Sequence, residues 1–325
     1  ASLAPSEMCI RDRPSNMTDK NIPKLYFTSH MDTVVPGINI KPEVKKDDYI
    51  YSDGTTILGA DDKAGLAAIL ETIHSIKEHQ LSHGQIQFVI TAGEESGLLG
   101  IKATDTNLLD ADFGYAVDAS KDVGTTVIGA PTQVKIYTTI KGKTAYASTP
   151  SKGISAINIA SKVISRMNLG QVDALTTANI GKFHVGSATN IVADEVVLEA
   201  EARSHNEESI ERQVQHMKDT FEMTASEYGG EAQVVIEKSY QGFKVNENDK
   251  VTQIAKASAL ALGLKGDTCI AGGGSDGSIM NQYGIPSVVL GVGYENIHTT
   301  SERVSTKDLY MLANQLLKII ELVTE

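Results

Sequence analysis

The sequence has no tryptophan, only two cysteines and no long apolar run. Cys9 and Cys269 are far apart and form no paired framework, which favours a reducing compartment, so we expect a cytoplasmic protein. No stretch approaches the roughly 18 apolar residues that cross a bilayer, and the N-terminus lacks the apolar core of a signal peptide. These features predict a globular protein with no membrane partner.

Positive charge is also scarce. Lys and Arg number 29 against 41 Asp and Glu, which gives a formal net charge of −12. Binding of a polyphosphate relies on clustered Lys and Arg, and the sequence has no basic stripe, so we do not expect a nucleic-acid partner. The 325 residues suffice for two domains, and their composition, 41% apolar and 22% charged, is typical of a folded protein.

Residues 1–21 show neither helical nor strand periodicity. The run from Ser6 to Arg13 resembles a translated sequencing adapter more than a protein segment. We therefore expect a non-native or disordered N-terminus, with the N-terminal part of the first domain missing, and exclude this stretch from the fold.

From Lys24 onwards, strand and helix patterns alternate. Apolar runs predict buried strands at residues 25–27, 85–90, 113–117 and 287–291. Apolar residues at steps of three and four predict a helix that contains Leu66, Ile69, Leu70, Ile73 and Ile76, and similar spacing predicts helices at 251–262 and 309–323. This alternation predicts a three-layer α/β domain with a mainly parallel sheet, over residues 22–130 and 239–325.

The pattern changes near Pro131. Alternating β-branched and polar residues predict strands, and apolar spacing predicts two helices at 154–167 and 210–228. An order of strand, helix, strand, strand, helix, strand predicts an inserted ferredoxin-like α+β domain over residues 131–238. Its edge strands could pair with a second copy of the chain.

Histidine and carboxylate side chains follow several predicted strands or begin a predicted helix. They are His30 with Asp32, Asp61 with Asp62, Glu94 with Glu95, Asp118, and His298. Because the carboxyl ends of parallel strands meet at one edge of a sheet, we expect these groups to converge. Mixed nitrogen and oxygen donors suit Zn²⁺, with Mn²⁺ or Co²⁺ as possible substitutes. The candidates exceed the three ligands usual for one catalytic zinc, so two ions are expected.

Simpler interpretations exist for individual residues. Alone, Glu94 and Glu95 would be solvated loop acids, and Asp61 and Asp62 would be helix-start acids near the positive end of the helix dipole. For Asp62 the helix-start role is the preferred one. The three glycines at 272–274 could suggest a phosphate cradle, but the Lys-Ser/Thr ending of a P-loop is absent.

Six motifs in order resemble the co-catalytic zinc exopeptidases, the family that includes peptidase T, carboxypeptidase G and the aminoacylases. They are His30-Met-Asp32, Gly59-Ala-Asp-Asp-Lys-Ala-Gly65, Gly93-Glu-Glu-Ser-Gly97, Val117-Asp118, Gly272-Gly-Gly-Ser-Asp276 and Ile297-His298. The resemblance extends from about residue 24 to the end and is strongest for the peptidase T-like subgroup. Each motif alone is weak evidence, whereas six in order are strong evidence.

The resemblance implies a role for each ligand candidate. Asp61 would bridge two metals. His30 and Asp118 would complete one site, and Glu95 and His298 the other. Asp32 would accept the N–H group of His30 and fix its tautomer, as carboxylates beside metal-bound imidazoles commonly do. Glu94 would be the general base that activates a water shared by the metals.

The resemblance also implies substrate contacts and a homodimer formed through the inserted domain, which would serve as a lid. The backbone at Gly273 and Gly274 would approach a peptide, Arg203 would grip its terminal carboxylate, and Asn190 would reach the site from the partner subunit. Tyr146 stands where the family typically has a histidine that stabilises the developing oxyanion. Tyrosine can donate a hydrogen bond but carries no positive charge.

The sequence therefore predicts a di-zinc exopeptidase that cleaves short peptides, most simply a tripeptide aminopeptidase. An N-acyl amino acid amidohydrolase or a carboxypeptidase with the same fold is the first alternative, because metal ligands do not separate these activities. The second alternative is a metal-binding or peptide-binding relative that the change at Tyr146 or a truncation has impaired.

Overall fold

The computed structural model describes residues 8–12, 21–186 and 188–325. The chain divides into two compact units: unit 1 consists of Ala1–Ala130 and Phe243–Glu325, and unit 2 of Pro131–Gly242. Most of the segment 1–21 that we excluded from the fold lies outside the described residues.

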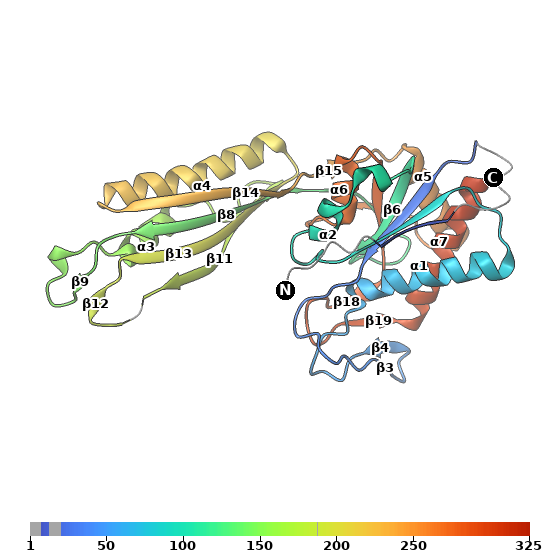
Figure 1. Cartoon of the computed structure of the whole chain (residues 1–325), viewed down its shortest axis with the longest axis horizontal. Helices are drawn as coiled ribbons and strands as arrows, with labels where there is room; N and C mark the ends of the chain where they lie inside the picture. Colours follow the sequence, from blue (N-terminus) through green and yellow to red (C-terminus); the bar gives the residue numbers. More distant parts are fainter. Residues whose placement is uncertain (1–7, 13–20, 187) are drawn as a thin grey trace. The chain divides into compact units, whose positions relative to one another are not determined.

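Unit 1 contains an eight-stranded sheet (Figure 1). Its strands are, in spatial order, β1 (Met8–Asp12), β5 (Ile86–Thr91), β2 (Leu25–His30), β6 (Phe113–Ala119), β17 (Ser287–Gly291), β7 (Thr126–Ala130) and β15 (Phe243–Lys244), with β16 (Thr268–Ile270) also paired to β7. The four central strands β5, β2, β6 and β17 are mutually parallel. The predicted α/β class with a mainly parallel sheet is confirmed.

Helices cover this sheet. They are α1 (Ala60–His79), α2 (Leu99–Ala103), α5 (Lys250–Ala261), α6 (Asp276–Gln282) and α7 (Thr306–Thr324), with a short 3₁₀ turn at Thr106–Leu108. Helices α1 and α7 pack together and α5 packs on α7, whereas α6 packs against α2. A smaller sheet joins distant parts of the chain in the order β18 (Tyr294–Glu295), β19 (Arg303–Ser305), β4 (Tyr49–Tyr51) and β3 (Glu43–Val44).

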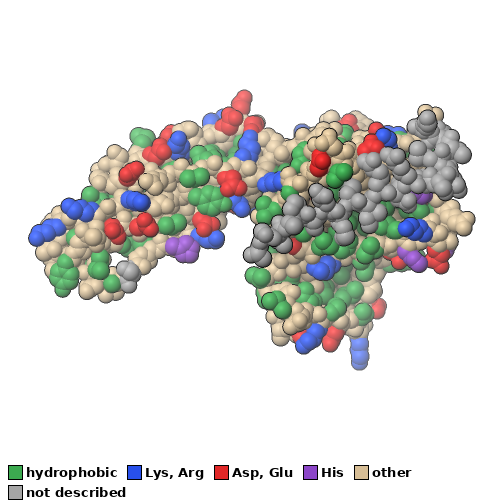
Figure 2. All heavy atoms as spheres, viewed as in Figure 1, with side chains coloured by type: hydrophobic (Ala, Val, Ile, Leu, Met, Phe, Trp, Pro, Cys, Tyr) green, Lys and Arg blue, Asp and Glu red, His purple; other side chains and the backbone are tan. Residues whose placement is uncertain are grey.

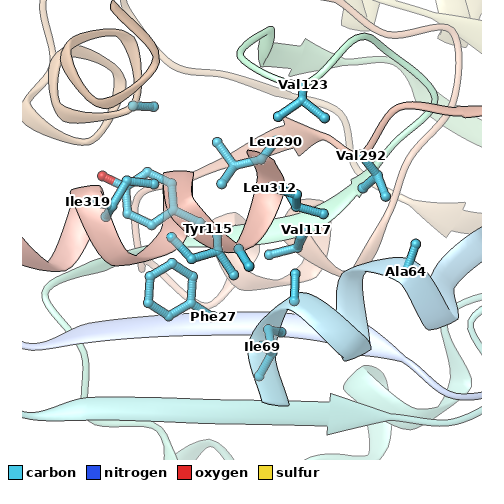
Figure 3. Close-up of a cluster of buried hydrophobic side chains, with 14 of the residues drawn as sticks. Phe27, Ala64, Ile69, Tyr115, Val117, Val123, Leu290, Val292, Leu312 and Ile319 are labelled. Carbon is cyan, nitrogen blue, oxygen red and sulfur yellow. The ribbon is translucent and has the colours of Figure 1, made fainter. Parts of the chain in front are cut away.

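The main core lies between the sheet and the helices α1, α5 and α7. Side chains from alternate positions of the strands meet those of the helices, as Figure 3 shows for Phe27 and Tyr115 beside Ile69 and Leu312. The rings of Phe27 and Tyr115 stack with their centroids 5.7 Å apart. Because a strand exposes successive side chains to opposite faces, burial of both faces accounts for its nearly continuous apolar sequence.

Helix α1 packs differently from the expectation. Leu70, which we placed on its apolar stripe, is 55% exposed, whereas the small residues Ala64 and Ala68 are buried. Gly65 is also buried, and a Cβ there would lie 2.2 Å from the carbonyl oxygen of Val117. Small side chains let the start of the helix approach strand β6 closely, which a count of large apolar residues does not detect.

Unit 2 is an antiparallel sheet with two helices. Its strands are β10 (Gly170–Gln171), β11 (Thr176–Val185), β13 (Glu195–Ser204), β8 (Thr132–Lys141) and β14 (Glu231–Tyr240), in spatial order, and its other elements are β9 (Ala145–Tyr146), β12 (Ile191–Val192), a 3₁₀ turn (Pro150–Lys152), α3 (Ala156–Arg166) and α4 (Glu207–Glu227). Along the chain the main elements run β8, α3, β11, β13, α4, β14, which is the ferredoxin-like order. Both helices pack against the sheet, and the core of unit 2 between them contains Ile136, Ile159 and Phe221.

Three details differ from the sequence expectations. Strand β1 lies in the segment that we excluded and pairs antiparallel with β5, whose free edge offers unpaired backbone groups to such a strand. No residue range was assigned to β11, because most of its side chains are exposed and it lacks an apolar run. The last strand of unit 2 continues to Tyr240, so the unit ends at Gly242 rather than at 238.

Charged side chains of both signs are interspersed on the described part of the face in Figure 2. Within the described ranges, no helix is long and apolar enough to span a membrane.

Candidate metal centre

Three neighbouring parallel strands bring the candidate ligands to one edge of the sheet. Strand β2 ends at His30, which is in register with Thr91 at the end of β5. The turn after β5 carries Glu94 and Glu95, and Asp118 is the penultimate residue of β6. The parallel register therefore aligns segments far apart in sequence, as in other open α/β sheets.

Asp61 lies between two imidazoles. Its Oδ1 is 3.2 Å from Nε2 of His30, and its Oδ2 is 3.1 Å from Nε2 of His298. Asp61 is buried in the first turn of α1, whereas the side chain of His298 is about half-exposed. One carboxylate with a histidine on each oxygen has the arrangement needed to bridge two cations.

Further carboxylates complete a cluster on each side of Asp61. Asp118 Oδ1 lies 3.7 Å from His30 Nε2 and accepts a hydrogen bond from the hydroxyl of Tyr294 at 3.0 Å. On the other side, Glu95 Oε1 lies 2.9 Å from His298 Nε2. Potential ligand atoms lie within 4.8 Å of one another in each of the sets His30, Asp61 and Asp118, and Asp61, Glu95 and His298.

Asp32 differs in detail from its expected role. Nδ1 of His30 donates its hydrogen bond to the backbone carbonyl of Asp32 at 2.9 Å, and the carboxylate is farther away, at 3.4 Å. The carboxylate instead accepts the backbone N–H groups of Glu94 and Glu95, each at 3.1 Å. Asp32 therefore contacts both the histidine and the glutamate turn.

Burial and close charges shift the pKa values of the clustered side chains. Burial raises the pKa of Glu94 to about 10, and the charge of Asp118 adds to this effect. Burial also raises the pKa of Asp118 and of Glu95. Burial alone would lower the pKa of His30, but its contacts with Asp118, Asp32 and Asp61 outweigh that effect and raise it. Crowded buried carboxylates of this kind gain stability from a bound cation.

Two observations test whether a divalent metal fits these residues. Glu95 Oε1 is buried and has no hydrogen-bond donor of good geometry. No Lys or Arg side chain forms an ion pair with Glu94, Glu95, Asp61 or Asp118 among the described residues. Imidazole nitrogens and carboxylate oxygens are the donors that zinc takes, so the residues fit such an ion.

Asp62 has a partner set of its own. Its side chain accepts hydrogen bonds from Ser29 Oγ at 2.5 Å and from the backbone N–H of Gly65 at 3.2 Å. Burial raises its pKa well above the ordinary value. The carboxylate of Asp62 thus accepts a backbone N–H group in the first turn of α1, in agreement with the preferred helix-start interpretation.

Two buried acids near the cluster were missed as functional residues. Glu302, 1% exposed, accepts the backbone N–H groups of Gly59 at 2.7 Å and Asp61 at 2.9 Å. Asp276 begins α6 and accepts hydrogen bonds from the hydroxyls of Thr28 and Thr91 on strands β2 and β5. Asp276 belongs to a motif that we quoted, and its acidic type among glycines was the available signal; Glu302 follows a serine in a polar loop and gave none.

The residues expected to contact the substrate belong to both units. Gly273 and Gly274 lie in the loop before α6 in unit 1. In unit 2, Tyr146 and Asn190 are neighbours, because β9 pairs with β12 and the N–H of Ala147 donates to the carbonyl of Asn190 at 2.9 Å. Tyr146 is 62% exposed.

Arg203 lies on β13, in register with Gln133 of β8. Its guanidinium donates to both carboxylate oxygens of Glu201, at 2.9 and 3.2 Å. A substrate carboxylate would have to share or replace this pairing, so the expected role of Arg203 stays a prediction.

The family model described as Peptidase family M20/M25/M40 matches residues 26–322. The chain belongs to this peptidase family. The match confirms the resemblance that the six motifs indicated.

Several relatives are similar over most of their length. A tripeptidase of known structure from Staphylococcus aureus subsp. aureus Mu50 is 67% identical with a TM-score of 0.92, covering 97% of this chain and 84% of that one. Aminopeptidase PepT from Bacillus cereus ATCC 10987 is 50% identical with a TM-score of 0.87, covering 98% and 84%. Uncharacterized protein YqjE from Bacillus subtilis strain 168 is 52% identical over 303 residues, 93% of this chain and 81% of that protein.

Proposed function

We propose that this chain is a metal-dependent exopeptidase that removes the N-terminal residue from tripeptides and binds two Zn²⁺ ions per subunit. The observation that carries the proposal is the position of Asp61, which has a histidine nitrogen 3.2 Å from one oxygen and another 3.1 Å from the other. The tripeptidase and aminopeptidase names of the relatives at 67% and 50% identity support the substrate class.

The ligand sets follow from the two clusters. His30 and Asp118 would hold one ion with Asp61, and Glu95 and His298 would hold the other. Bound divalent cations would polarise the scissile carbonyl and lower the pKa of an attacking water molecule. Mn²⁺ or Co²⁺ could replace Zn²⁺ at donors of these types.

The chain's own residues would carry the proton transfers. Glu94 is partly buried beside the clusters and is not assigned as a ligand. Burial and the charge of Asp118 raise its pKa to about 10 in the metal-free cluster. Bound cations would lower that pKa, so that its carboxylate could take a proton from water. The same carboxyl group can then deliver that proton to the leaving amine, as a general acid. Asp32 holds the backbone of this turn through two N–H groups and thereby orients Glu94.

Unit 2 would serve as the lid and as the dimerisation domain. This proposal rests on its independent core, its ferredoxin-like order and the exposed apolar side chains of the edge strand β14, among them Val235, which is 62% exposed. Arg203, Asn190 and Tyr146 would then contact the peptide substrate, in part across the dimer. The cytoplasmic compartment stays a prediction from the sequence.

The test is hydrolysis of a defined panel. The protein, loaded with Zn²⁺ or Mn²⁺, is incubated with tripeptides, dipeptides and N-acetyl amino acids, and the products are identified by mass. We expect release of the N-terminal residue from tripeptides, and loss of that release after treatment with a chelator. Restoration by added Zn²⁺ is the control for irreversible damage.

Other outcomes would contradict the proposal. Cleavage of only N-acetyl amino acids would assign the chain to the amidohydrolases, and release of C-terminal residues would assign it to the carboxypeptidases. Peptide binding without any cleavage, by folded and metal-loaded protein, would identify an impaired relative.

A further inference from the structure

Glu302 is a buried acid whose two oxygens both accept backbone hydrogen bonds from one short segment. Oε2 accepts the N–H of Gly59 at 2.7 Å, and Oε1 accepts the N–H of Asp61 at 2.9 Å. The segment 59–61 leads directly into the candidate bridging ligand. A bidentate contact of this kind fixes both the position and the direction of the backbone at Asp61.

Gly59 fits this contact for a conformational reason. Its φ of +74° lies in the left-handed region, and a Cβ there would come within 3.1 Å of Thr33 Cγ2. Glycine adopts this region without a steric penalty. Its N–H can therefore turn towards Glu302 while the chain continues into α1.

The same acid belongs to the loop that presents His298. This loop connects β18 to β19, and His298 itself has a φ of +62°. Hydrogen bonds within the loop hold that conformation, from Thr299 Oγ1 to the carbonyl of Asn296 at 2.7 Å and from the N–H of Glu302 to the carbonyl of Thr299 at 3.2 Å. Glu302 thus connects the segment of one candidate ligand to the loop of another.

The charge of Glu302 also matters. Its described partners are backbone N–H groups, and no described Lys or Arg forms an ion pair with it. Burying an ionised carboxylate without a cation is costly, although hydrogen bonds from N–H groups reduce the cost. A carboxylate that accepts the N–H of Asp61 would favour a cation bound at Asp61, because Coulomb energies are larger in a poorly solvated region.

We propose that Glu302 is a positioning residue that fixes Asp61 relative to His298 and thereby sets the affinity of the metal site formed by Asp61, Glu95 and His298. This inference rests on the proposed metal-dependent function. It predicts a larger effect at this site than at the other. Asp61 is shared by both, but the loop that contains Glu302 supplies His298 to this site only, whereas His30 and Asp118 lie on strands of the main sheet. Residues beyond the ligands typically change metal affinity by 10- to 100-fold when they are replaced.

The test is a titration of metal-free protein with Co²⁺, followed by visible absorption and by calorimetry. Glu302→Gln keeps the length of the side chain but removes the charge and places an NH₂ group against a backbone N–H. We expect two binding events in the parent. In the variant, one event should weaken by roughly 10- to 100-fold, and the other, which shares Asp61 but not His298, should weaken by a clearly smaller factor.

Three further variants make the result specific. His298→Ala identifies the event that belongs to the site with Glu95, and the event weakened in Glu302→Gln should be the same one. Tyr115→Phe removes a buried hydrogen bond to the carbonyl of Val251, 3.1 Å long, and controls for general loss of stability. If Glu302→Gln does not fold, Glu302→Asp, which keeps the charge but shortens the side chain, is judged by the same criteria.

Two results would overturn the inference: equal affinities in the variant and the parent, or equal weakening of both events. A parent protein that binds no Co²⁺, or binds one ion only, would instead refute the proposed two-metal function. The two failures are therefore distinguishable in the same titration.

Discussion

The carboxylate of Asp32 accepts the backbone N–H group of Glu94 at 3.1 Å, across the gap between two strand ends. Its second oxygen accepts the N–H of Glu95 at the same distance. Burial alone would raise the pKa of Asp32, but the nearby imidazole of His30 and the hydrogen bond from the backbone of Glu94 outweigh that effect and lower the pKa to about 2. Asp32 thus joins the His30 strand to the glutamate turn, in addition to facing the imidazole.

Asp32→Asn should reduce turnover without unfolding the protein. The amide keeps one acceptor oxygen but opposes one backbone N–H with an NH₂ group, which loosens the turn that holds Glu94. We expect kcat for a tripeptide to fall by roughly 10- to 100-fold, in line with the usual cost of changing groups behind metal ligands. Asp53→Asn replaces an acid that pairs with Thr55 in a surface turn and is the control. An unchanged kcat would show that the two N–H contacts are dispensable.

Glu94→Gln should separate binding from chemistry. The amide has nearly the same shape but cannot take a proton from water, and general acid–base groups typically contribute about 10²- to 10⁴-fold to a rate. We expect a fall in kcat of that size with unchanged metal content and a peptide dissociation constant within about threefold of the parent, measured by calorimetry. Hydrolysis at the parental rate would remove Glu94 from the mechanism.

The convergence of the ligand candidates could be predicted because it depends on simple rules. His30 and Asp118 belong to parallel strands, and Glu94 follows a third, so their meeting at one edge follows from strand order alone. The meeting of Asp61 with His298 was expected from the same rule, with Asp61 at a helix start and His298 after a strand, and only their roles as ligands came from the resemblance. Their individual roles stay predictions.

The residues behind the ligands could not be predicted in the same way. Glu302 contacts backbone N–H groups more than 240 positions earlier in the chain, and backbone groups leave no mark in the sequence. Tyr294 lies beside Asp118 because β17, which ends shortly before Tyr294, pairs with the distant strand β6, and no periodicity indicates which strands pair. In the fold, Leu70 was misplaced because the contact surface of α1 is made by Ala64 and Ala68, whose small size permits the close approach.

Tyr146→His should raise turnover. Tyr146 is exposed on β9 beside Asn190, and its hydroxyl can donate a hydrogen bond but brings no positive charge to a developing oxyanion. A donor in such a position is worth about 10²- to 10³-fold, so the partial improvement from tyrosine to histidine should be at most about 100-fold in kcat. Tyr146→Phe, which removes the donor, should lower kcat. Turnover in the histidine variant equal to or below that of the parent would contradict the assignment.

Asp276 provides a test by pH at an acid that is not itself a candidate metal ligand. Burial raises its pKa to about 6, and the hydrogen bond from Thr91 works in the opposite direction. The charges that face it are those of His30, Asp118 and Asp32. One of its oxygens, Oδ1, is buried without a hydrogen-bond partner. The folded protein therefore holds the proton of Asp276 more tightly than the unfolded chain, in which the pKa is near its ordinary value of about 3.9.

The sign of the effect follows from proton linkage. Between about pH 4 and pH 6 the folded state binds more protons at Asp276 than the unfolded state, so this residue destabilises the fold progressively as the pH rises through that range. Asp276→Asn retains an acceptor for Thr91 and removes the titration. The free energy of unfolding of the variant, relative to the parent, should therefore increase by about 1.5 kcal/mol between about pH 5 and about pH 7.5. Urea unfolding of chelator-treated protein at both pH values measures this difference, with Asp48→Asn as an exposed-carboxylate control. A constant difference between variant and parent would mean that Asp276 is ionised throughout, and the short contact with Thr91 would then be a hydrogen bond to a carboxylate.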